Sequence, residues 1–472
     1  MQMTRWRRAA ATLSVVALLA VACGNDEPAT VSPTDEDADA TEAPDDADAT
    51  DDVDTDADAT DDEDAQAAPG DIQFDTGVTE DACPNAVNPD NGCIYLGVLS
   101  DLTEGPFAAL GVPLTEAQRD FWNRVNEDGG IAGFDVDIDT YTRDTKFDPQ
   151  EHSSAYRQIE PNILALHQSL GTEPTEAILR DMDDDDVIAS PATWWSGWGF
   201  EEKDRGLILE IGYSYCIESM IALDYVSENI AEPGSVMAVG YPGDFGGDSA
   251  AGVEAWAEAA GVEFLGFVET APNAIVGSQD AAISQIVSGA PDVVMLAVGP
   301  AETAEIVGGS AAQGFEGQFM GSVPTWNPAL LQTPAAPALE AMYLHVGFAE
   351  NFDGESEAHD KLREARDGEP PVNDAYTYGW IQSYPILRAL EAAAANGDLT
   401  RQGLRSVVDG LVVDYEGALP DQVYGGDPSE NVQREGVISR PDSESPLGYT
   451  TLEAGFTGPI ASEYDYAGPC SG

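Results

Sequence analysis

Short apolar runs alternate with amphipathic segments from about residue 92 onward. Runs of strand length predict strands at Ile94–Leu99, Val136–Tyr141, Ile163–His167, Val187–Ser190, Ser235–Gly240, Val262–Val268, Asp292–Val298 and Gln318–Gly321. Apolar residues at helical spacing predict helices at Thr115–Asn126, Glu173–Met182, Gly246–Ala260, Asp280–Ser288 and Ala301–Gln313. Strands that alternate with helices in this way predict parallel sheets with right-handed crossovers, and therefore an α/β fold.

The loops that follow the predicted strands form the candidate site, because ligands of parallel sheets bind beyond the carboxyl ends of the strands. These loops are Thr103–Gly111, Ser169–Thr172, Pro191–Trp198, Gly243–Gly246, Gly299–Pro300 and Ser322–Trp326. Trp194, Trp195 and Trp198 share one of them, and three indoles in one loop are hard to bury together. Two interpretations stay open for this loop, a buried aromatic cluster and a cleft wall that contains at least one indole.

Residues 1–23 have the pattern of a secretory signal. Three arginines precede an apolar run, Ala9–Ala22, which is shorter than the roughly 20 residues that a membrane-spanning helix needs. The small residues that end on Cys23 resemble the bacterial lipobox, in which the cysteine is acylated. We predict a lipoprotein signal peptide, lipidation at Cys23 and attachment to the extracytoplasmic face of the cell membrane. The alternative is an ordinary cleaved signal with a spare cysteine.

Residues 24–81 contain 23 acidic residues and no Lys or Arg. Like-charge repulsion and the scarcity of large apolar groups leave nothing to offset the entropy of ordering this segment, so we predict a disordered acidic tether. Calcium binding by the Asp runs is a weaker alternative, because no loop has EF-hand spacing. Of the 87 acidic and 19 basic residues, 64 and 16 follow residue 81, which argues against nucleic acid as a partner. This imbalance fits a saline habitat or an acidic proteome.

The cysteines predict a disulfide framework. Without Cys23 four remain, an even number in an exported protein. Cys83 and Cys93 bracket a turn-rich loop and are expected to pair, which would leave Cys216 to pair with Cys470, although three connectivities are possible in principle. No metal site or cofactor is predicted, because no CxxC spacing occurs and the four histidines are scattered. An enzyme is not expected, since no catalytic triad, G-x-S-x-G or H-E-x-x-H motif is present.

Five motifs together resemble the branched-chain amino acid (Leu/Ile/Val) substrate-binding proteins of ABC transporters, which have the type I periplasmic binding fold. They are Asn126–Gly133 (NEDGGIAG), Ser190–Thr193 (SPAT), Asp244–Gly246 (DFG), Phe319–Gly321 (FMG) and Asp374–Gly379 (DAYTYG), and the resemblance spans about residues 92–470. It implies two doubly wound parallel-sheet lobes joined by a three-strand hinge. The expected lobes are 92–211 plus 350–412 and 212–349 plus 413–472, so Cys216 and Cys470 would share a lobe.

The resemblance also implies ligand contacts. Gly171 and Thr172 would hold a carboxylate at a helix N-terminus, where the helix dipole favours an anion. The other implied contacts are Leu110, Ala192, Thr193, Trp194, Phe245, Pro300, Val323 and Trp326. The family's amino-acid binders place a Glu near position 323 for the ligand ammonium, and a Thr at position 194. Val323 and Trp194 therefore argue against a free α-amino acid and favour a larger or less zwitterionic solute, whose identity the sequence does not give.

The implied function is that of a lipid-anchored, extracytoplasmic solute-binding component of an ABC importer. It would act as a monomer, capture a small amino-acid-like or related organic solute by hinge closure and be recognised by permease subunits in the membrane. The hinge strands are expected near Ile211–Tyr213, Phe348–Asn351 and Val413–Ala418. A ligand-sensing receptor of the same fold is the alternative, and an extracellular hydrolase is a less favoured one.

Overall fold

The computed structural model describes residues 72–472, which belong to one compact unit. The predicted signal peptide, the lipidation site Cys23 and most of the predicted tether lie outside the described residues. The last ten residues assigned to the tether, 72–81, are ordered instead. Ile72 and Val78 are buried, and two short strands, β1 (Gln73–Phe74) and β2 (Val78–Thr79), pair with the folded body. The tether prediction is wrong there because these apolar residues anchor an otherwise acidic segment.

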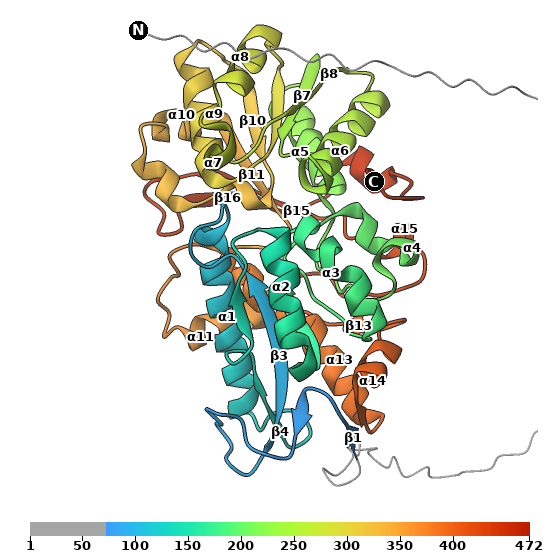
Figure 1. Ribbon diagram of the computed structural model, residues 1–472. Coiled ribbons are helices and arrows are strands. Elements are labelled where there is room, and N and C mark those ends of the chain that lie inside the picture. Colours follow the sequence, from blue (N-terminus) through green and yellow to red (C-terminus); the bar gives the residue numbers. More distant parts are fainter. Residues whose placement is uncertain (1–71) are drawn as a thin grey trace, which may run out of the picture. The chain divides into compact units, whose positions relative to one another are not determined.

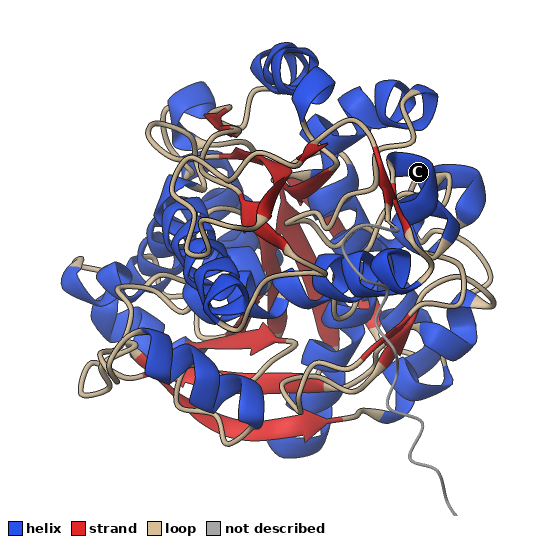
Figure 2. Ribbon diagram, turned by 90° about the horizontal axis from the view of Figure 1, so that it is seen from below, coloured by secondary structure: helices blue, strands red, loops and turns tan. Residues whose placement is uncertain are grey.

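The first sheet is built around β3 (Gly92–Ser100), which is buried along most of its length (Figure 1). Parallel to it lie β4 (Phe134–Asp137), β5 (Thr142–Asp144) and β6 (Ala165–Ser169), and β2 adds an antiparallel edge. The helices that follow these strands are α1 (Ala108–Glu127), α2 (Pro149–Ile159) and α3 (Thr172–Asp184). Figure 2 shows the strands enclosed by helices, as expected when parallel strands are joined by helical crossovers.

The second sheet has seven strands in the order β16-β15-β11-β10-β9-β7-β8. Five of them are parallel: β7 (Ser235–Gly240), β8 (Glu263–Glu269), β9 (Val293–Ala297), β10 (Gln318–Gly321) and β11 (Tyr343–Gly347). The helices on this sheet are α5 (Tyr215–Asn229), α6 (Asp244–Ala260), α7 (Asn273–Val276), α8 (Asp280–Gly289), α9 (Pro300–Ala312) and α10 (Ala336–Met342). β15 (Gly436–Pro441) and β16 (Tyr449–Phe456) are antiparallel and form an edge that the alternating pattern did not predict.

The chain returns to the first sheet between β11 and β15. There α12 (Ala375–Ile381) packs against α1, and β12 (Asp398–Leu399) pairs with β1. The remaining elements of this return are α11 (Glu357–Ala365), α13 (Ser383–Ala395), α14 (Arg401–Ser406), β13 (Val412–Val413), β14 (Gln422–Val423) and α15 (Pro428–Asn431). Short helices complete the chain at α4 (Glu201–Asp204) and α16 (Pro459–Glu463), with 3-10 turns at Glu160–Asn162, Ser196–Gly199, Val323–Thr325 and Pro328–Gln332.

Three predicted elements differ from the observed ones. Helix α1 begins at Ala108 rather than at Thr115, and Pro113 lies inside it. The strand expected at Val136–Tyr141 ends at Asp137. The segment Val187–Ser190 forms only isolated bridges, through Ala189, and no strand.

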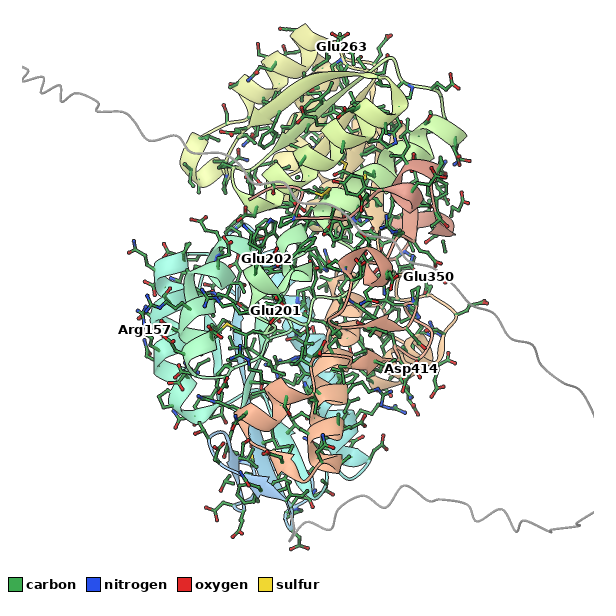
Figure 3. The ribbon with its side chains drawn as sticks, turned by 90° about the vertical axis from the view of Figure 1, so that its right-hand side faces the viewer. Arg157, Glu201, Glu202, Glu263, Glu350 and Asp414 are labelled. Carbon is green, nitrogen blue, oxygen red and sulfur yellow. A yellow bond between two sulfur atoms is a disulfide. The ribbon has the colours of Figure 1, made fainter. Side chains whose placement is uncertain are left out.

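Both predicted disulfides are present, Cys83–Cys93 and Cys216–Cys470. The first closes the loop before β3, and the second ties the start of α5 to the C-terminal segment. Charged side chains cover the surface, and the five acidic residues labelled in Figure 3 are all exposed (Glu201, Glu202, Glu263, Glu350 and Asp414). Within residues 72–472 no helix has both the length and the apolar character required to cross a bilayer.

Candidate ligand-binding cavity

A cavity lies between the loops at the carboxyl ends of the two sheets. It encloses about 720 Å³ of empty space, including its mouth. Its wall is mainly aromatic and aliphatic and consists of Phe107, Leu110, Leu114, Phe147, Leu170, Gly171, Thr172, Ala192, Trp194, Tyr215, Phe245, Val323, Pro324, Trp326, His345, Asn373, Asp374, Ala375, Tyr378 and Tyr449. The apolar wall is typical of a site for a small organic molecule.

The structure brings eight of the ten predicted contact residues into this one wall: Leu110, Gly171, Thr172, Ala192, Trp194, Phe245, Val323 and Trp326. Thr193 lies behind the wall, where its hydroxyl is hydrogen-bonded to the Thr172 hydroxyl. Pro300 begins α9 and is buried outside the wall. The open question about the tryptophan loop is also answered, because Trp194 lines the cavity while Trp195 and Trp198 pack edge to face with ring centres 5.0 Å apart.

One end of the cavity, the α3 end, consists of Phe107, Phe147, Gly171 and Thr172. Gly171 is the N-cap of α3, and the first amides of a helix lack intrahelical acceptors. The Gly171 amide, however, already donates to the carbonyl of Ala192 at 3.2 Å. The Gly171 amide is therefore occupied by a protein group, and the Thr172 hydroxyl shares a hydrogen bond with the Thr193 hydroxyl.

The middle of the cavity is a chain of aromatic rings. Tyr215 and Phe245 have ring centres 4.6 Å apart, and Trp194 lies edge-on to Tyr215 at 6.0 Å. Phe245 in turn contacts Phe107, with ring centres 6.3 Å apart. Aromatic edges and faces of this kind favour apolar or π-bearing groups and supply no charge.

The other end, the α12 end, consists of Trp326, Asn373, Asp374 and Tyr449. Tyr449 on β16 donates its hydroxyl hydrogen to the Asp374 carboxylate, which also accepts from Thr377 Oγ1 at 2.8 Å and from the Phe352 amide at 2.9 Å. Burial raises the pKa of Asp374 to about 7 despite these three donors. Asp374 is thus a satisfied, weakly charged group and a poor partner for an ammonium ion.

Two further titratable groups lie at or behind this wall. Burial lowers the pKa of His345 to about 4, so the imidazole is neutral, and its Nε2 lies 3.3 Å from the carbonyl oxygen of Val323. Glu218 on α5 sits behind Val323 and accepts its amide hydrogen at 2.8 Å. Burial raises the pKa of Glu218 to about 8, so this side chain is a neutral acid near pH 7.

Hydrogen-bond donors are in excess in the wall. The indole N–H groups of Trp194 and Trp326 and the amide nitrogen of Asn373 are buried and have no partner among the described residues. The Asn373 amide is oriented by its oxygen, which accepts from the Ala375 amide at 2.7 Å and leaves the nitrogen unpaired. Each unpaired buried donor costs about 1–3 kcal/mol, so a ligand with acceptor atoms would relieve this cost.

Several wall residues were not predicted from the sequence. Phe107, Leu170 and Pro324 lie inside loops that were proposed as the site. Asp374, Ala375 and Tyr378 belong to the DAYTYG motif, and Asn373 precedes it. No local pattern marks Leu114, Phe147, Tyr215, His345 or Tyr449. Within residues 72–472 no group of three or more His, Cys, Asp or Glu side chains is arranged to hold a metal ion.

The model of the family described as "Periplasmic binding protein" matches residues 94–433. The chain belongs to this family. Its fold is the type I periplasmic binding fold of ABC transporter substrate-binding proteins, which confirms the predicted α/β architecture with two lobes. The members of this family are extracytoplasmic binding proteins and not enzymes. No curated protein sequence matches the chain.

Solved structures with the same fold include a fatty acid ABC transporter substrate-binding protein from Thermomonospora curvata. It is 24% identical, with a TM-score of 0.75, and the match covers 86% of this chain and 99% of that one. A branched chain amino acid ABC transporter protein from Thermus thermophilus with bound valine is 17% identical, with a TM-score of 0.66 and coverage of 79% and 98%. A leucine binding protein from Thermotoga maritima is 14% identical, with a TM-score of 0.62 and coverage of 77% and 99%.

Proposed function

We propose that this periplasmic binding protein is the solute receptor of an ABC importer, and that its ligand is an apolar organic molecule with a hydrogen-bond acceptor and without an ammonium group. The observation that carries the proposal is the composition of the cavity wall. Three buried N–H donors are unpaired, whereas the wall's single carboxylate, on Asp374, already accepts from three donors. A zwitterionic amino acid would bury two charged groups in a wall that has no Lys or Arg and one weakly charged carboxylate, whereas a carboxylic acid would bury one.

Straight-chain carboxylic acids are the ligand class that fits this wall best. Their carboxylate supplies acceptors, and their hydrocarbon chain matches the aromatic middle of the cavity. The Thermomonospora curvata protein is described as a fatty acid ABC transporter substrate-binding protein, which supports carboxylic acids as the ligand class. The Thermus thermophilus and Thermotoga maritima proteins are described as amino-acid binders, which supports amino acids. We favour the acids because the position of the family's glutamate holds Val323 here.

Capture is proposed to occur by closure of the lobes predicted from the sequence, 92–211 plus 350–412 against 212–349 plus 413–472. Two hydrogen bonds in the structure join residues of the two predicted lobes. Tyr449 donates to Asp374, and the Tyr215 amide donates to the carbonyl of Trp194 at 2.7 Å. A ligand that makes contacts with both lobes shifts the population toward the closed form, which the permease would recognise.

The proposed location is the extracytoplasmic face of the membrane, through a lipid on Cys23, with the receptor acting as a monomer. Fractionation of cells that express the full chain tests the anchor. The wild-type protein should sediment with membranes, and Cys23→Ser should be released. Equal release of both proteins would overturn the lipid anchor without affecting the ligand proposal.

A thermal-shift screen tests the ligand class. Octanoate, octanamide, octanol, leucine and phenylalanine are each added to the purified mature protein. A ligand that binds only the folded form at about 100 times its Kd stabilises that form by about 2.7 kcal/mol, which is a clear rise in melting temperature. We expect rises with the eight-carbon compounds and none with the two amino acids. Rises with leucine or phenylalanine alone would overturn the proposed class.

A further inference from the structure

A strained turn at the α3 end of the cavity presents Phe147. Lys146 and Phe147 have φ angles of 54° and 57°, and among residues 72–472 they are the one adjacent pair of non-glycine residues with positive φ. Side chains disfavour this left-handed region, so such a pair persists only where the surroundings fix it. Strain of this kind gathers at sites with a function.

Hydrogen bonds fix the turn on both sides. The carboxylate of Asp144 accepts from the amides of Leu102 and Lys146, at 3.0 and 3.2 Å, and from the Thr103 hydroxyl. After the turn, the Asp148 side chain caps α2 by accepting from the amides of Gln150 and Glu151, at 2.8 and 2.9 Å. The turn is therefore held between β5 and α2.

The turn places the Phe147 ring on the start of α3. A Cβ atom added to Gly171 would lie 2.4 Å from Cε2 of Phe147, so the ring rests directly on this glycine, whose own φ is 96°. The ring also packs edge-on against Phe107, with centres 4.8 Å apart. The α3 end is thus covered by two phenyl rings, and its Gly171 amide and Thr172 hydroxyl are already hydrogen-bonded to Ala192 and Thr193.

The α12 end has the opposite character. Trp326 stacks on Tyr343, with ring centres 5.7 Å apart, so its indole is held in place while its N–H has no partner. Asn373, whose amide nitrogen is unpaired, precedes Asp374 in the chain. The Tyr449 ring packs against Trp326, and the Tyr449 hydroxyl donates to Asp374. The α12 end therefore contains two residues whose donors have no acceptor among the described residues, Trp326 and Asn373.

We propose that the ligand lies in the cavity with its acceptor group at the α12 end, bound by Trp326 Nε1 and Asn373 Nδ2, and with its apolar end against Phe147. This orientation is the reverse of the one that the family resemblance implies, in which Gly171 and Thr172 hold the carboxylate. It rests on the proposed function, whose ligand class it uses. Phe147 then limits the length of the apolar end, and Trp326 and Asn373 select the polar group.

Calorimetric titration of four variants with octanoate tests the orientation. Trp326→Phe keeps the ring and removes the N–H, and Asn373→Ala removes the amide, so each should weaken binding about five- to tenfold. Thr172→Val should weaken it clearly less. Trp256→Phe is the matched control, because it removes an indole N–H that donates to Asp224 outside the cavity, at 2.8 Å, and should leave the affinity unchanged.

A second readout is the preferred chain length from butanoate to hexadecanoate. Phe147→Ala should move the preference toward longer acids, because the apolar end gains the space of the ring. Phe315→Ala is the control for loss of a ring that packs on a glycine, because Phe315 packs on Gly317 and neither residue lines the cavity. This variant should not change the preferred chain length.

The outcomes separate the two proposals. A dominant loss with Thr172→Val, or an equal loss for all chain lengths with Phe147→Ala, would overturn the orientation and leave the proposed function intact. Failure of every acid to bind the wild-type protein, at concentrations where leucine binds, would overturn the ligand class and the orientation together.

Discussion

Two regions on opposite sides of the tryptophan loop bury polar groups in opposite ways. On one side Asp248 of α6 is fully buried and accepts from the amides of Ser196 and Cys216, each at 3.1 Å, and from the hydroxyls of Ser196 and Ser471. On the other side lies the cavity, where the donors of Trp194, Trp326 and Asn373 have no partners. The Asp248 carboxylate has four donors within the protein, whereas the three donors of the cavity have no acceptor among the described residues.

The C-terminal segment Tyr466–Gly472, which we call the C-terminal strap, contributes hydrogen-bond partners to the first region. Cys470 is bonded to Cys216, its amide donates to Ser196 Oγ at 2.8 Å, and the Tyr466 hydroxyl donates to the carbonyl of Ser196 at 3.1 Å. The strap thus supplies groups that the cavity lacks. We infer from this difference that a ligand supplies the hydrogen-bond acceptors for the cavity, as the C-terminal strap supplies hydrogen-bond partners for the tryptophan loop.

The largest expected effect comes from releasing the strap. The double variant Cys216→Ser, Cys470→Ser removes a crosslink between residues 254 positions apart and should lower the free energy of unfolding by about 2–4 kcal/mol. The pair Cys83→Ser, Cys93→Ser, with a separation of 10, should cost less because its loop is short. Urea denaturation measures both. Equal losses would contradict the role given to the strap.

The next effect is expected at Asp248. Asp248→Ala leaves the amides of Ser196 and Cys216 without an acceptor and should cost about 1–3 kcal/mol for each group that stays unpaired. Asp248→Asn keeps an acceptor oxygen and should cost less. Denaturation with both variants checks the order, and an alanine variant as stable as the wild type would show that this region is not stabilised by its hydrogen bonds.

A smaller effect concerns pH. Burial raises the pKa of Glu218 from 4.5 to about 8 and that of Asp374 from 3.8 to about 7. The folded state therefore binds these protons more tightly than the unfolded state, so their stabilisation is complete below about pH 4 and is lost as the pH rises through about 7 to 8. We expect the free energy of unfolding to fall between about pH 5 and pH 7, and to fall less in Glu218→Gln. A rise in the free energy of unfolding from pH 5 to pH 7 would contradict the conclusion that burial raises the pKa values of Glu218 and Asp374.

The smallest effect comes from two neighbouring indoles. Trp195 donates its N–H to the carbonyl of Ser471 in the strap at 3.1 Å, whereas the Trp194 N–H is unpaired. Trp195→Phe should lower stability by about 1 kcal/mol, and Trp194→Phe should leave it unchanged or raise it slightly. Ligand affinity should stay unchanged in Trp195→Phe, because this indole lies outside the cavity wall. The reverse pattern would mean that the two regions do not differ as described.

The sequence predicted the repeating strands and helices because their apolar periodicity is local, and it located much of the cavity because loops at the carboxyl ends of parallel strands meet. Leu110 was expected in a loop and lies in α1, yet it still lines the cavity. The antiparallel edge formed by β15 and β16 was missed, since its pairing depends on a late return of the chain, and Tyr449 was missed with it.

Other wall residues depend on geometry that a single sequence does not encode. Phe147 reaches the cavity only because two residues adopt positive φ under the control of Asp144. The unpaired state of Trp326 and Asn373 is a property of the assembled wall and has no local signature. The resemblance implied a ligand contact for Thr193, whose hydroxyl is hydrogen-bonded to that of Thr172 behind the wall.

The central claim is that the cavity selects an acceptor and rejects an ammonium group. The most direct measurement is calorimetric titration of the mature protein with octanoate and with octylammonium, which share a hydrocarbon chain and differ in the charge of the polar group. The chain's formal net charge of −68 favours the ammonium over the whole surface, so a preference for the carboxylate must arise in the cavity. We predict saturable one-to-one binding of octanoate and none of octylammonium. Saturable binding of octylammonium alone would contradict the account.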